Sequence, residues 1–506
     1  MNVVEPVLLK ELNEKDYESL INYRIRKILM ICSNYDAFIL EEDGQIESQI
    51  FREYSDLNLS NPPKFIWVQT AAEARELLNT VVGIDMVMCM YNVTDKEVFS
   101  LASEIKADRP YLPFVLLTHF SKEVYRRLSL QDTSAIDYMF SWHGNADLIV
   151  AIIKLFEDLK NADHDILGVG VQAILLVEDS VRYYSTYLPE LYKLVLMQTN
   201  EFLTETINQQ QRKIRKRSRP KILLATNYED ALNMYEKYKN NLLGVISDVG
   251  FTLYKDEGPE KEVLDAGVTL VRHIKNDDPM MPVLLQSSQE SIAAVAEEIG
   301  VGFLKKYSKT LMLQLSDYIK EEFGFGDFVF RDDNRVEYGR ASNLKELEYL
   351  VRSVPDDVLL KATSKNMLSK WFHSRGLFTL GGKVKAVQES EFATVADMRH
   401  YVSQQIHDFH ALMGRGVIAH FDSEKYGRHV WFSRMGEGSL GGKARGLAFL
   451  NSLVDKYCLA NKYPGVKISI PRTVVIATDY FDQFILENDL QYVIDSDVTD
   501  EEILSE

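Results

Sequence analysis

The chain has 506 residues, of which 46% are hydrophobic, and at about 100–200 residues per domain we expect three or four domains. Its net charge of −18 argues against general binding to nucleic acid or to a membrane surface, because both are negatively charged. The three scattered cysteines, Cys32, Cys89 and Cys458, indicate neither a disulfide framework nor a metal site. The acidic lead 1–22 lacks a signal core, and no apolar run is long enough for a membrane helix, so we expect a cytoplasmic protein.

A first α/β unit is expected over residues 23–160. Its pattern begins at Arg26 and opens with an apolar run that is typical of a strand buried on both faces of a parallel sheet, and helical and short apolar segments then alternate. Cys32 and Cys89 are expected on adjacent strands, as ordinary buried thiols rather than redox sensors. No carboxylate stands at the expected strand ends, which carry Ser33 with Asn34, Met90, Thr118 and Ser141. Asp36 is better interpreted as a helix cap than as a displaced acid.

A second unit of the same kind is expected over residues 168–326. Helical stretches separate five apolar runs, at 173–177, 221–226, 242–247, 282–287 and 302–306. Five strands with intervening helices indicate a doubly wound α/β domain, in which ligands bind at the carboxyl ends of the strands.

The strand ends of this second unit carry all the polar groups of a phosphoryl site. Glu178 and Asp179 follow the first strand, Asp248 the third, Ser287 ends the fourth and Lys306 the fifth. Three converging carboxylates make a hard oxygen site that suits Mg²⁺. A hydroxyl and an ammonium at the same point can hold phosphoryl oxygens. A lone Asp or Lys would be an ordinary cap or solvated charge, but chance rarely places five suitable residues at successive strand ends.

This constellation resembles the response-regulator receiver family. The resemblance implies that Asp248 attacks a phosphodonor and becomes an aspartyl phosphate. It further implies that Glu178 and Asp179 hold Mg²⁺ together with Asp248 and the backbone carbonyl of Gly250.

By the same resemblance, Ser287 and Lys306 would sense the phosphoryl group. Phe303, three residues before the lysine, stands where the family carries its switch aromatic, although an aromatic beside a strand is as readily a core residue. The phosphodonor would be a cognate histidine kinase or phosphotransfer protein.

The first unit then looks like a pseudo-receiver, which keeps the pattern without the carboxylates and with no lysine near Ser141. Such a domain is expected to serve as an interaction surface, so a homodimer through the receiver domains or docking of a partner is anticipated.

Two segments of the second unit are longer than is usual in receivers. The stretch 180–220 predicts a long amphipathic helix that protrudes beyond the domain and ends in the basic run 212–221. This run could dock an acidic partner or acidic residues of the chain itself, but a solvated helix end is the favoured interpretation. The loop 250–267 after Asp248 could cover the site or influence the choice of partner.

Residues 327–430 carry helical signals, at 344–354 and 395–413, and are interpreted as a helical connector. His407 and His410 on the second of these helices could suggest a histidine kinase. No ATP-binding domain of that family follows, however, and a structural role for both side chains is favoured.

The last segment, 431–506, opens with a glycine-rich turn followed by Lys443 and an Ala- and Leu-rich helix, which suggests amides and a lysine directed at phosphates. It is not a P-loop, because Glu437 and Ala444 stand at positions that a P-loop fills with Gly and Ser or Thr. Together with residues 468–489 it looks like the start of the ATP-binding domain of phosphoenolpyruvate synthase and pyruvate phosphate dikinase. By this resemblance the ATP-binding residues would be Gly441, Gly442, Lys443 and, in an assisting role, Arg445.

Taken together, the sequence predicts two tandem flavodoxin-like sheets of five parallel strands, a mainly helical connector and a partial ATP-grasp-like α+β segment. The expected function is a phosphorelay module in which Mg²⁺-dependent phosphorylation of Asp248 regulates phosphoenolpyruvate synthase-like domains. The chain itself is expected to be a fragment rather than a complete enzyme. The alternatives are an assembly module that acts without phosphorylation and an ATP-binding enzyme fragment.

Overall fold

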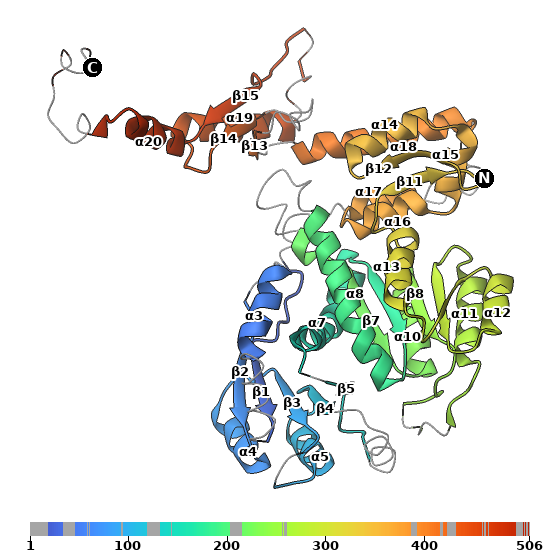
Figure 1. The fold of residues 1–506 in the computed structure, drawn as a ribbon. Helices are drawn as coiled ribbons and strands as arrows, with labels where there is room; N and C mark the ends of the chain where they lie inside the picture. Colours follow the sequence, from blue (N-terminus) through green and yellow to red (C-terminus); the bar gives the residue numbers. More distant parts are fainter. Residues whose placement is uncertain are drawn as a thin grey trace. The chain divides into compact units, whose positions relative to one another are not determined.

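A computed structural model gives the architecture of the chain (Figure 1). Apart from a few isolated positions, it describes residues 19–33, 46–57, 61–92, 95–118, 132–142, 144–202, 215–255, 261–385, 392–414, 418–421, 432–457 and 465–491. The chain divides into two compact units. The first comprises residues up to 204 and 214–398, and the second comprises 205–213 and 399–506.

The first α/β domain is built on a parallel five-stranded sheet in the order β2-β1-β3-β4-β5. Its strands are β1 (Lys27–Ile31), β2 (Lys64–Val68), β3 (Met86–Met90), β4 (Phe114–Thr118) and β5 (Tyr138–Ser141). The described helices between and after them are α3 (Ile46–Asp56), α4 (Ala71–Thr80), α5 (Val98–Asp108) and α7 (Ala146–Ala162). Asn34 and Asp36, which were expected at a strand end and as a helix cap, lie outside the described residues.

The second α/β domain repeats this topology with the sheet order β10-β9-β8-β6-β7. Its strands are β6 (Ala173–Val177), β7 (Lys221–Ala225), β8 (Leu242–Asp248), β9 (Val283–Ser287) and β10 (Gly302–Lys305). The helices are α8 (Val181–Phe202), α10 (Tyr228–Tyr238), α11 (Ala266–Asp277), α12 (Ile292–Ile299) and α13 (Leu311–Glu322), with a 3₁₀ turn at Lys239–Asn241. Both sheets have the order expected of flavodoxin-like folds.

Burial explains why the strands are continuous apolar runs rather than alternating ones. Every residue of β3, β4, β6, β7 and β9 is buried, because helices cover both faces of a parallel sheet. Cys89 on β3 lies beside Cys32 at the end of β1, and both are buried free thiols. Burial, and then the neighbouring Cys32, raise the pKa of the Cys89 thiol, so the thiolate is disfavoured there.

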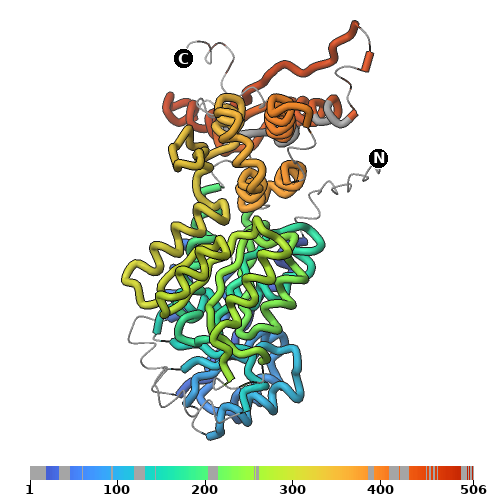
Figure 2. Tube along the Cα trace, turned by 90° about the vertical axis from the view of Figure 1, so that its right-hand side faces the viewer, coloured from blue at the N-terminus to red at the C-terminus, as the bar shows by residue number. Residues whose placement is uncertain are grey.

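The two α/β domains share one hydrophobic core. Helix α7 is buried around most of its circumference and packs against α3 of its own domain and against α8 and β7 of the next one. Phe140 on β5 meets Tyr184 on α8 edge to face, with 5.4 Å between ring centroids. The hydroxyl of Tyr138 donates a hydrogen bond of 2.9 Å to the carbonyl of Leu224 on β7. The blue and green parts of the chain lie side by side in both views (Figure 1 and Figure 2).

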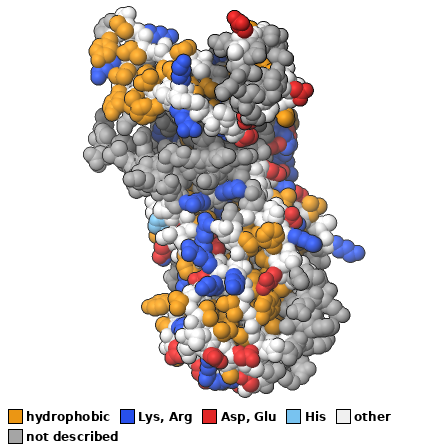
Figure 3. All heavy atoms as spheres, turned by 90° about the vertical axis from the view of Figure 1, so that its left-hand side faces the viewer, with side chains coloured by type: hydrophobic (Ala, Val, Ile, Leu, Met, Phe, Trp, Pro, Cys, Tyr) orange, Lys and Arg blue, Asp and Glu red, His pale blue; other side chains and the backbone are white. Residues whose placement is uncertain are grey.

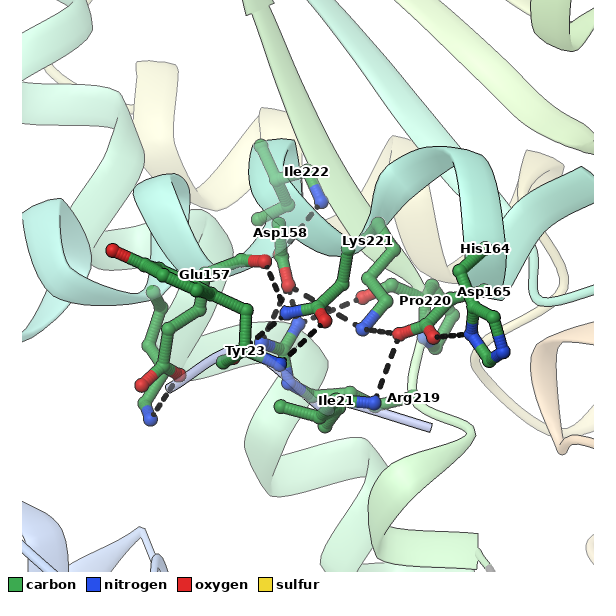
Figure 4. Close-up of polar contacts among 12 residues, drawn as sticks. Ile21, Tyr23, Glu157, Asp158, His164, Asp165, Arg219, Pro220, Lys221 and Ile222 are labelled. Atoms are coloured by element: carbon green, nitrogen blue, oxygen red, sulfur yellow. Dashed lines mark hydrogen bonds and ion pairs between the residues drawn. The ribbon is translucent and has the colours of Figure 1, made fainter. Parts of the chain in front are cut away.

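A buried ionic network fixes this junction (Figure 4). The guanidinium of Arg219 forms two hydrogen bonds, of 2.8 and 3.0 Å, with the carboxylate of Asp158 on α7. The ammonium of Lys221 lies 2.7 Å from Asp165, in the π-helical turn Asp163–Val169 that follows α7. Asp165 also accepts from the backbone amide of Ile21. These carboxylates therefore tie the segment before β1 to the segment before β7.

This network corrects the interpretation of the basic run as a solvated helix end. Arg215, Arg219 and Lys221 are buried, with exposed fractions of 8%, 3% and 0%. The alternative that the run docks on the chain's own acidic residues is the one observed for Arg219 and Lys221. Their partners, Asp158 on α7 and Asp165 in the turn that follows it, lie about sixty residues earlier, and local periodicity does not reveal pairs so far apart in sequence.

Helix α8 confirms the amphipathic pattern predicted after residue 180. Its inward face buries Tyr187, Leu188, Leu191 and Val195. Residues 203–214, which include the start of the basic run, lie outside the described part of the chain.

The connector is mainly helical but begins with a β-hairpin that the sequence did not reveal. Strands β11 (Phe328–Arg331) and β12 (Glu337–Ala341) pair antiparallel and precede α14 (Leu344–Ser353), α15 (Asp356–Ser364), α16 (Met367–Ser374), α17 (Phe378–Lys385) and α18 (Val395–Gly414). Gly324 adopts a φ of +77°, and the indole of Trp371 donates to the carbonyl of Gly326 at 3.0 Å. Helix α16 therefore packs directly on the end of the second α/β domain.

The second unit contains a small parallel sheet, β13-β14-β15. Its elements are β13 (Ile418–His420), β14 (Phe432–Met435), α19 (Gly442–Lys456), β15 (Thr473–Ile476) and α20 (Thr478–Glu487). His407 and His410 lie on α18, and the side chain of His410 is outside the described part. Within the described residues, no helix is long and apolar enough to cross a membrane.

Candidate functional site: an acidic pocket at the end of the second sheet

Three carboxylates converge where β6 and β8 end. Glu178 and Asp179 follow β6, and Asp248 is the last residue of β8, which pairs with β6 in parallel. One oxygen of each carboxylate lies within 4.8 Å of the others. Their sequence separation is 70 residues, so this cluster exists only because parallel strands bring their carboxyl ends to one edge.

Lys306 bridges two of these carboxylates. Its ammonium lies 2.6 Å from Oδ2 of Asp248 and 2.7 Å from Oε2 of Glu178. The Lys306 side chain is 5% exposed, and those of Glu178 and Asp248 are 1% and 14% exposed. The lysine is placed by β10, because its amide donates to the carbonyl of Ser287 at the end of neighbouring β9.

The charges in the pocket favour the binding of a cation. Desolvation, reinforced by Asp248, raises the pKa of Glu178 well above its usual value. Desolvation, then Asp248 and then Glu262, raise the pKa of Asp179 to about 7. Desolvation alone would lower the pKa of Lys306, but the carboxylates of Glu178 and Asp248 outweigh it and raise that pKa. One ammonium thus faces three carboxylates, and a divalent cation would complete the charge balance.

The residues present fit a Mg²⁺ ion. Oxygen ligands from at least two carboxylates are its usual protein partners, and the cluster supplies them from Glu178, Asp179 and Asp248. The part expected of the Gly250 carbonyl stays a prediction. A Cβ atom at Gly250 would lie 2.3 Å from Oε1 of Glu262, so the absence of a side chain there lets Glu262 approach the acidic edge.

The two predicted phosphoryl-sensing residues lie at neighbouring strand ends. Ser287 is 6% exposed, and its hydroxyl oxygen accepts a hydrogen bond of 3.1 Å from the amide of Gln289. A hydroxyl that accepts one bond can still donate its own proton. Phe303 is half-buried on β10 and packs against the core of its domain, which keeps both its core role and its expected switch role open.

The backbone at Asp248 is held closely by α11. A Cβ atom at Gly267 would lie 1.9 Å from the carbonyl oxygen of Asp248, and the amide of Gly267 donates to Val249 at 2.8 Å. The amide of Val249 in turn donates to Oδ1 of Asp248 at 2.7 Å. Because residue 267 is a glycine, the start of α11 can approach the backbone at Asp248 closely and hold it in place.

Aromatic side chains beside the pocket were missed by the sequence analysis. The ring of Tyr183 lies with its centroid 4.2 Å from the Lys306 ammonium, a cation–π contact. Tyr183 also contacts Tyr187 and Tyr307, with ring centroids 5.8 and 5.9 Å apart. The clue was the spacing of Tyr183 and Tyr187, four residues apart on the helix that leaves the acidic pair.

The equivalent edge of the first domain is apolar. In the second sheet, the backbone amides of Glu178 and Lys306 donate hydrogen bonds to the neighbouring strands. In the first sheet, the amides of Cys32 and Trp142 donate the equivalent bonds. The positions that match the acid pair are therefore Cys32 and Ser33, one residue earlier than predicted. Met90 matches Asp248, as expected. Cys32, Met90 and Trp142 are buried in one apolar cluster, so these three positions supply no carboxylate or lysine in place of Glu178, Asp248 and Lys306.

The glycine-rich segment of the second unit places its predicted residues at the start of α19. Gly441 directly precedes the helix, Gly442 is its first residue, and Lys443 and Arg445 lie exposed in its first turn. The preceding turn is held by α20: the amide of Glu437 donates to Asp479 at 2.7 Å and that of Ser439 to Thr478 at 2.9 Å.

No protein-family model and no curated protein matches the chain. Among solved structures, it is similar to one titled as a putative two-component system response regulator/GGDEF domain protein, with 15% identity, a TM-score of 0.25 and coverage of 58% of this chain and 98% of that one. A second structure, titled as a probable protein of the same kind, has 14% identity, a TM-score of 0.26 and the same coverage. NtrX from Brucella abortus has 11% identity and a TM-score of 0.22, with 85% of this chain and 93% of that one covered. Likenesses this distant carry no argument about function, which must be argued from the pocket itself.

Proposed function

We propose that the second α/β domain is a phosphorylatable receiver, with Asp248 as the phosphoacceptor. The observation that carries this proposal is the convergence of Glu178, Asp179 and Asp248 within 4.8 Å, with Lys306 bridging two of them. A purely structural ion pair would need one carboxylate for one lysine. This pocket has three carboxylates for one lysine, at the carboxyl edge of the sheet. Bound Mg²⁺, held by these three carboxylates, would neutralise the charge of an approaching phosphoryl group.

The chemistry assigned to Asp248 is a phosphoryl transfer. A carboxylate oxygen forms a bond to phosphorus, and the bond between phosphorus and the donor breaks, so that the donor leaves with the electron pair. Lys306, 2.6 Å from Oδ2, holds the carboxylate in place and stabilises the charge on the phosphoryl oxygens. The amide of Val249 fixes the other oxygen.

The response proposed for the pocket is a change of partners. A phosphoryl group on Asp248 brings new acceptor oxygens, to which Lys306 and the Ser287 hydroxyl can donate. Lys306 would then withdraw from Glu178 and from the ring of Tyr183, which it contacts in the unphosphorylated structure. Movement of the β9 and β10 ends, with Phe303 as a switch residue, would carry the change to the surface around α12 and α13.

The partners of this module follow from the proposed chemistry. A histidine kinase or phosphotransfer protein would supply the phosphoryl group, and the first domain would serve for docking, including formation of a homodimer. The competing function is an assembly module that is indifferent to phosphorylation. It would form the same complexes whether or not Asp248 is modified.

A second candidate function concerns the start of α19. The exposed Lys443 and Arg445 lie in the first turn of a helix that begins at Gly442, directly after Gly441, an arrangement suited to phosphate groups of ATP. This supports a phosphoenolpyruvate synthase-like nucleotide-binding segment that the receiver would regulate. ATP binding that is lost in Lys443→Gln but kept in Lys467→Gln would support this role.

The test of the main proposal is the intact mass of the full chain after incubation with acetyl phosphate and Mg²⁺. We expect one added phosphoryl group, which is absent in Asp248→Asn and without Mg²⁺. The matched control is Asp265→Asn, because Asp265 is an exposed carboxylate directly before α11 and outside the cluster. Unmodified wild-type protein, or equal modification of Asp248→Asn, would contradict the assignment.

A further inference from the structure

A cavity of about 340 Å³ lies within the first unit, at the junction of the two α/β domains. Its wall combines residues from the segment 21–26 before β1, from 57–61 after α3, from α7, from α8 and from 216–219 before β7. Small-molecule sites typically have volumes of ~300–1,000 Å³. The cavity thus has room for a small ligand, and it shares no lining residue with the acidic pocket.

The lining of this cavity is strongly basic although the chain is acidic. Among the lining residues Glu157 is the only carboxylate, and the cations are Arg24, Arg26, Lys154, Lys216, Arg217 and Arg219. A concave surface lined by one sign of charge concentrates ions of the opposite sign. Figure 3 shows Lys and Arg side chains close together over the middle of one described face, so positive charge is locally concentrated on this acidic protein.

Two of the cations are held rigidly in the cavity wall. Arg219 is 3% exposed and is fixed by its two hydrogen bonds to Asp158. Lys154 is 8% exposed, lies 2.7 Å from Glu157 and faces the ring of Tyr54 at 5.1 Å. Side chains that are already ordered lose little entropy when a ligand binds, so these residues form a preorganised part of the wall.

The remaining wall is partly apolar. Ile25, Leu57 and Leu196 contribute to it and are themselves buried, with exposed fractions of 2%, 8% and 4%. A bare inorganic anion would use only the cationic side of such a cavity. A ligand with both a charged group and an apolar body would use both sides.

We propose that this cavity binds a small molecule that joins a phosphate or polyphosphate group to an aromatic body, of the size of a nucleoside diphosphate. Arginine forks match phosphate oxygens in a bidentate manner, and Arg24, Arg26 and Arg217 line the cavity beside Arg219, whose own fork holds Asp158. The apolar side provides a surface for the base. Such a ligand contacts elements of both α/β domains, so its occupancy stabilises their junction independently of phosphorylation at Asp248.

The experiment is isothermal titration calorimetry of the full chain with ADP and, separately, with GDP and inorganic pyrophosphate. EDTA excludes the metal from the acidic pocket, and a Lys443→Gln background removes the second candidate phosphate site. We expect saturable binding of at least one nucleotide, and binding at least about tenfold weaker in Arg24→Gln/Arg217→Gln, since charge-assisted hydrogen bonds are lost. The conservative control is Lys64→Gln/Arg272→Gln, two exposed cations that do not line the cavity.

Three results would overturn the proposal. The first is no binding of either nucleotide to the folded wild-type chain, and the second is affinity unchanged in Arg24→Gln/Arg217→Gln. The third is pyrophosphate binding as tight as that of the nucleotides, since the apolar side would then contribute nothing. Thermal melting of each variant identifies a folding defect, and the single variant Arg26→Gln, at an exposed position, provides an independent decrease in affinity if the double variant does not fold.

Discussion

At the scale of single residues, the acidic pocket of the second domain brings several ionisable side chains together in a largely buried position. Glu178 and Lys306 are almost completely buried, and each is stable there only because the other groups of the pocket compensate its charge. Asp179 is half-buried, and its raised pKa of about 7 makes its protonation sensitive to changes of pH near neutrality.

The first prediction concerns pH. In the metal-free folded protein Asp179 keeps its proton up to about pH 7, whereas the unfolded chain loses it near ~4. The stability from this group is therefore full below about pH 4 and is lost as the pH rises towards 7. Mg²⁺ must displace the proton, so we expect its affinity to increase as the pH rises towards 7, by about tenfold per pH unit for each proton displaced. Calorimetric titration at several pH values measures this, and a flat profile from pH 5.5 to 8 would contradict it.

The second prediction concerns Lys306. Lys306→Met leaves the buried Glu178 and Asp248 without their counter-ion, so we expect the metal-free protein to lose about 3–5 kcal/mol of unfolding free energy. Mg²⁺ should restore more stability in this variant than in wild type. The matched control is Lys305→Met, because Lys305 is 53% exposed and its pair with Glu290 contributes at most about 1 kcal/mol. Urea denaturation with and without Mg²⁺ measures both, and equal losses in the two variants would refute the bridging role.

At the scale of elements, the carboxyl ends of the strands could be predicted because each strand is a continuous apolar run that stops at a polar residue. That is why Glu178, Asp179, Asp248, Ser287 and Lys306 were all found from the sequence. The aromatic neighbours Tyr183 and Tyr307 were not found, because their role depends on the direction in which α8 leaves β6 and on the turn after Lys306.

The prediction that the basic run is solvated was wrong for a related reason. Local periodicity describes a helix and its solvated end, but it does not reveal that Asp158 and Asp165 on another element neutralise Arg219 and Lys221. The one-residue error at Cys32 and Ser33 has the same origin, since only the pairing with β2 fixes the register. The hairpin β11–β12 was missed because its two strands are short and largely exposed at β12.

The third prediction belongs to the junction elements. Arg219→Met removes the bidentate partner of Asp158, which is fully buried on α7, and we expect a loss of about 3–5 kcal/mol in unfolding free energy. Lys237→Met should change it by less than about 1 kcal/mol, because the pair of Lys237 with Asp163 is about half exposed or more on both sides. Chemical denaturation compares the two, and a near-neutral Arg219→Met would show that the network does not stabilise the junction.

At the scale of the whole molecule, the two α/β domains of the first unit are joined by a continuous hydrophobic core. The core that contains Phe140 and Leu155 of the first domain also contains Leu176 and Leu188 of the second. The first domain, which has no carboxylates at the matching positions, thereby supports the domain that carries the acidic pocket. Cys32, Met90 and Trp142, the apolar edge of the first domain, belong to this same core. The apolar residues at these positions therefore contribute to the core that the two domains share.

The fourth prediction tests this shared core. Phe140→Ala removes a fully buried ring that touches Tyr184 across the domain junction, and we expect it to cost about 3–5 kcal/mol. Because the core is continuous, hydrogen exchange should accelerate in β6 and β7 of the second domain as well as in β4 and β5. The control is Phe51→Ala on α3, where the side chain is 61% exposed. Acceleration confined to the first domain would mean that the two domains open independently.

The central claim, that Asp248 is the phosphoacceptor, is tested most directly by locating the modification. An aspartyl phosphate is reduced by borohydride to homoserine, which marks the residue permanently for peptide mass spectrometry. After treatment of the full chain with acetyl phosphate and Mg²⁺, we predict homoserine at position 248 and none at Asp179. We predict no hydroxynorvaline, the product that a glutamyl phosphate would give, at Glu178 or Glu262, and neither product anywhere in Asp248→Asn. Homoserine at another carboxylate, or its absence from a folded protein that binds Mg²⁺, would contradict the assignment and favour the assembly module.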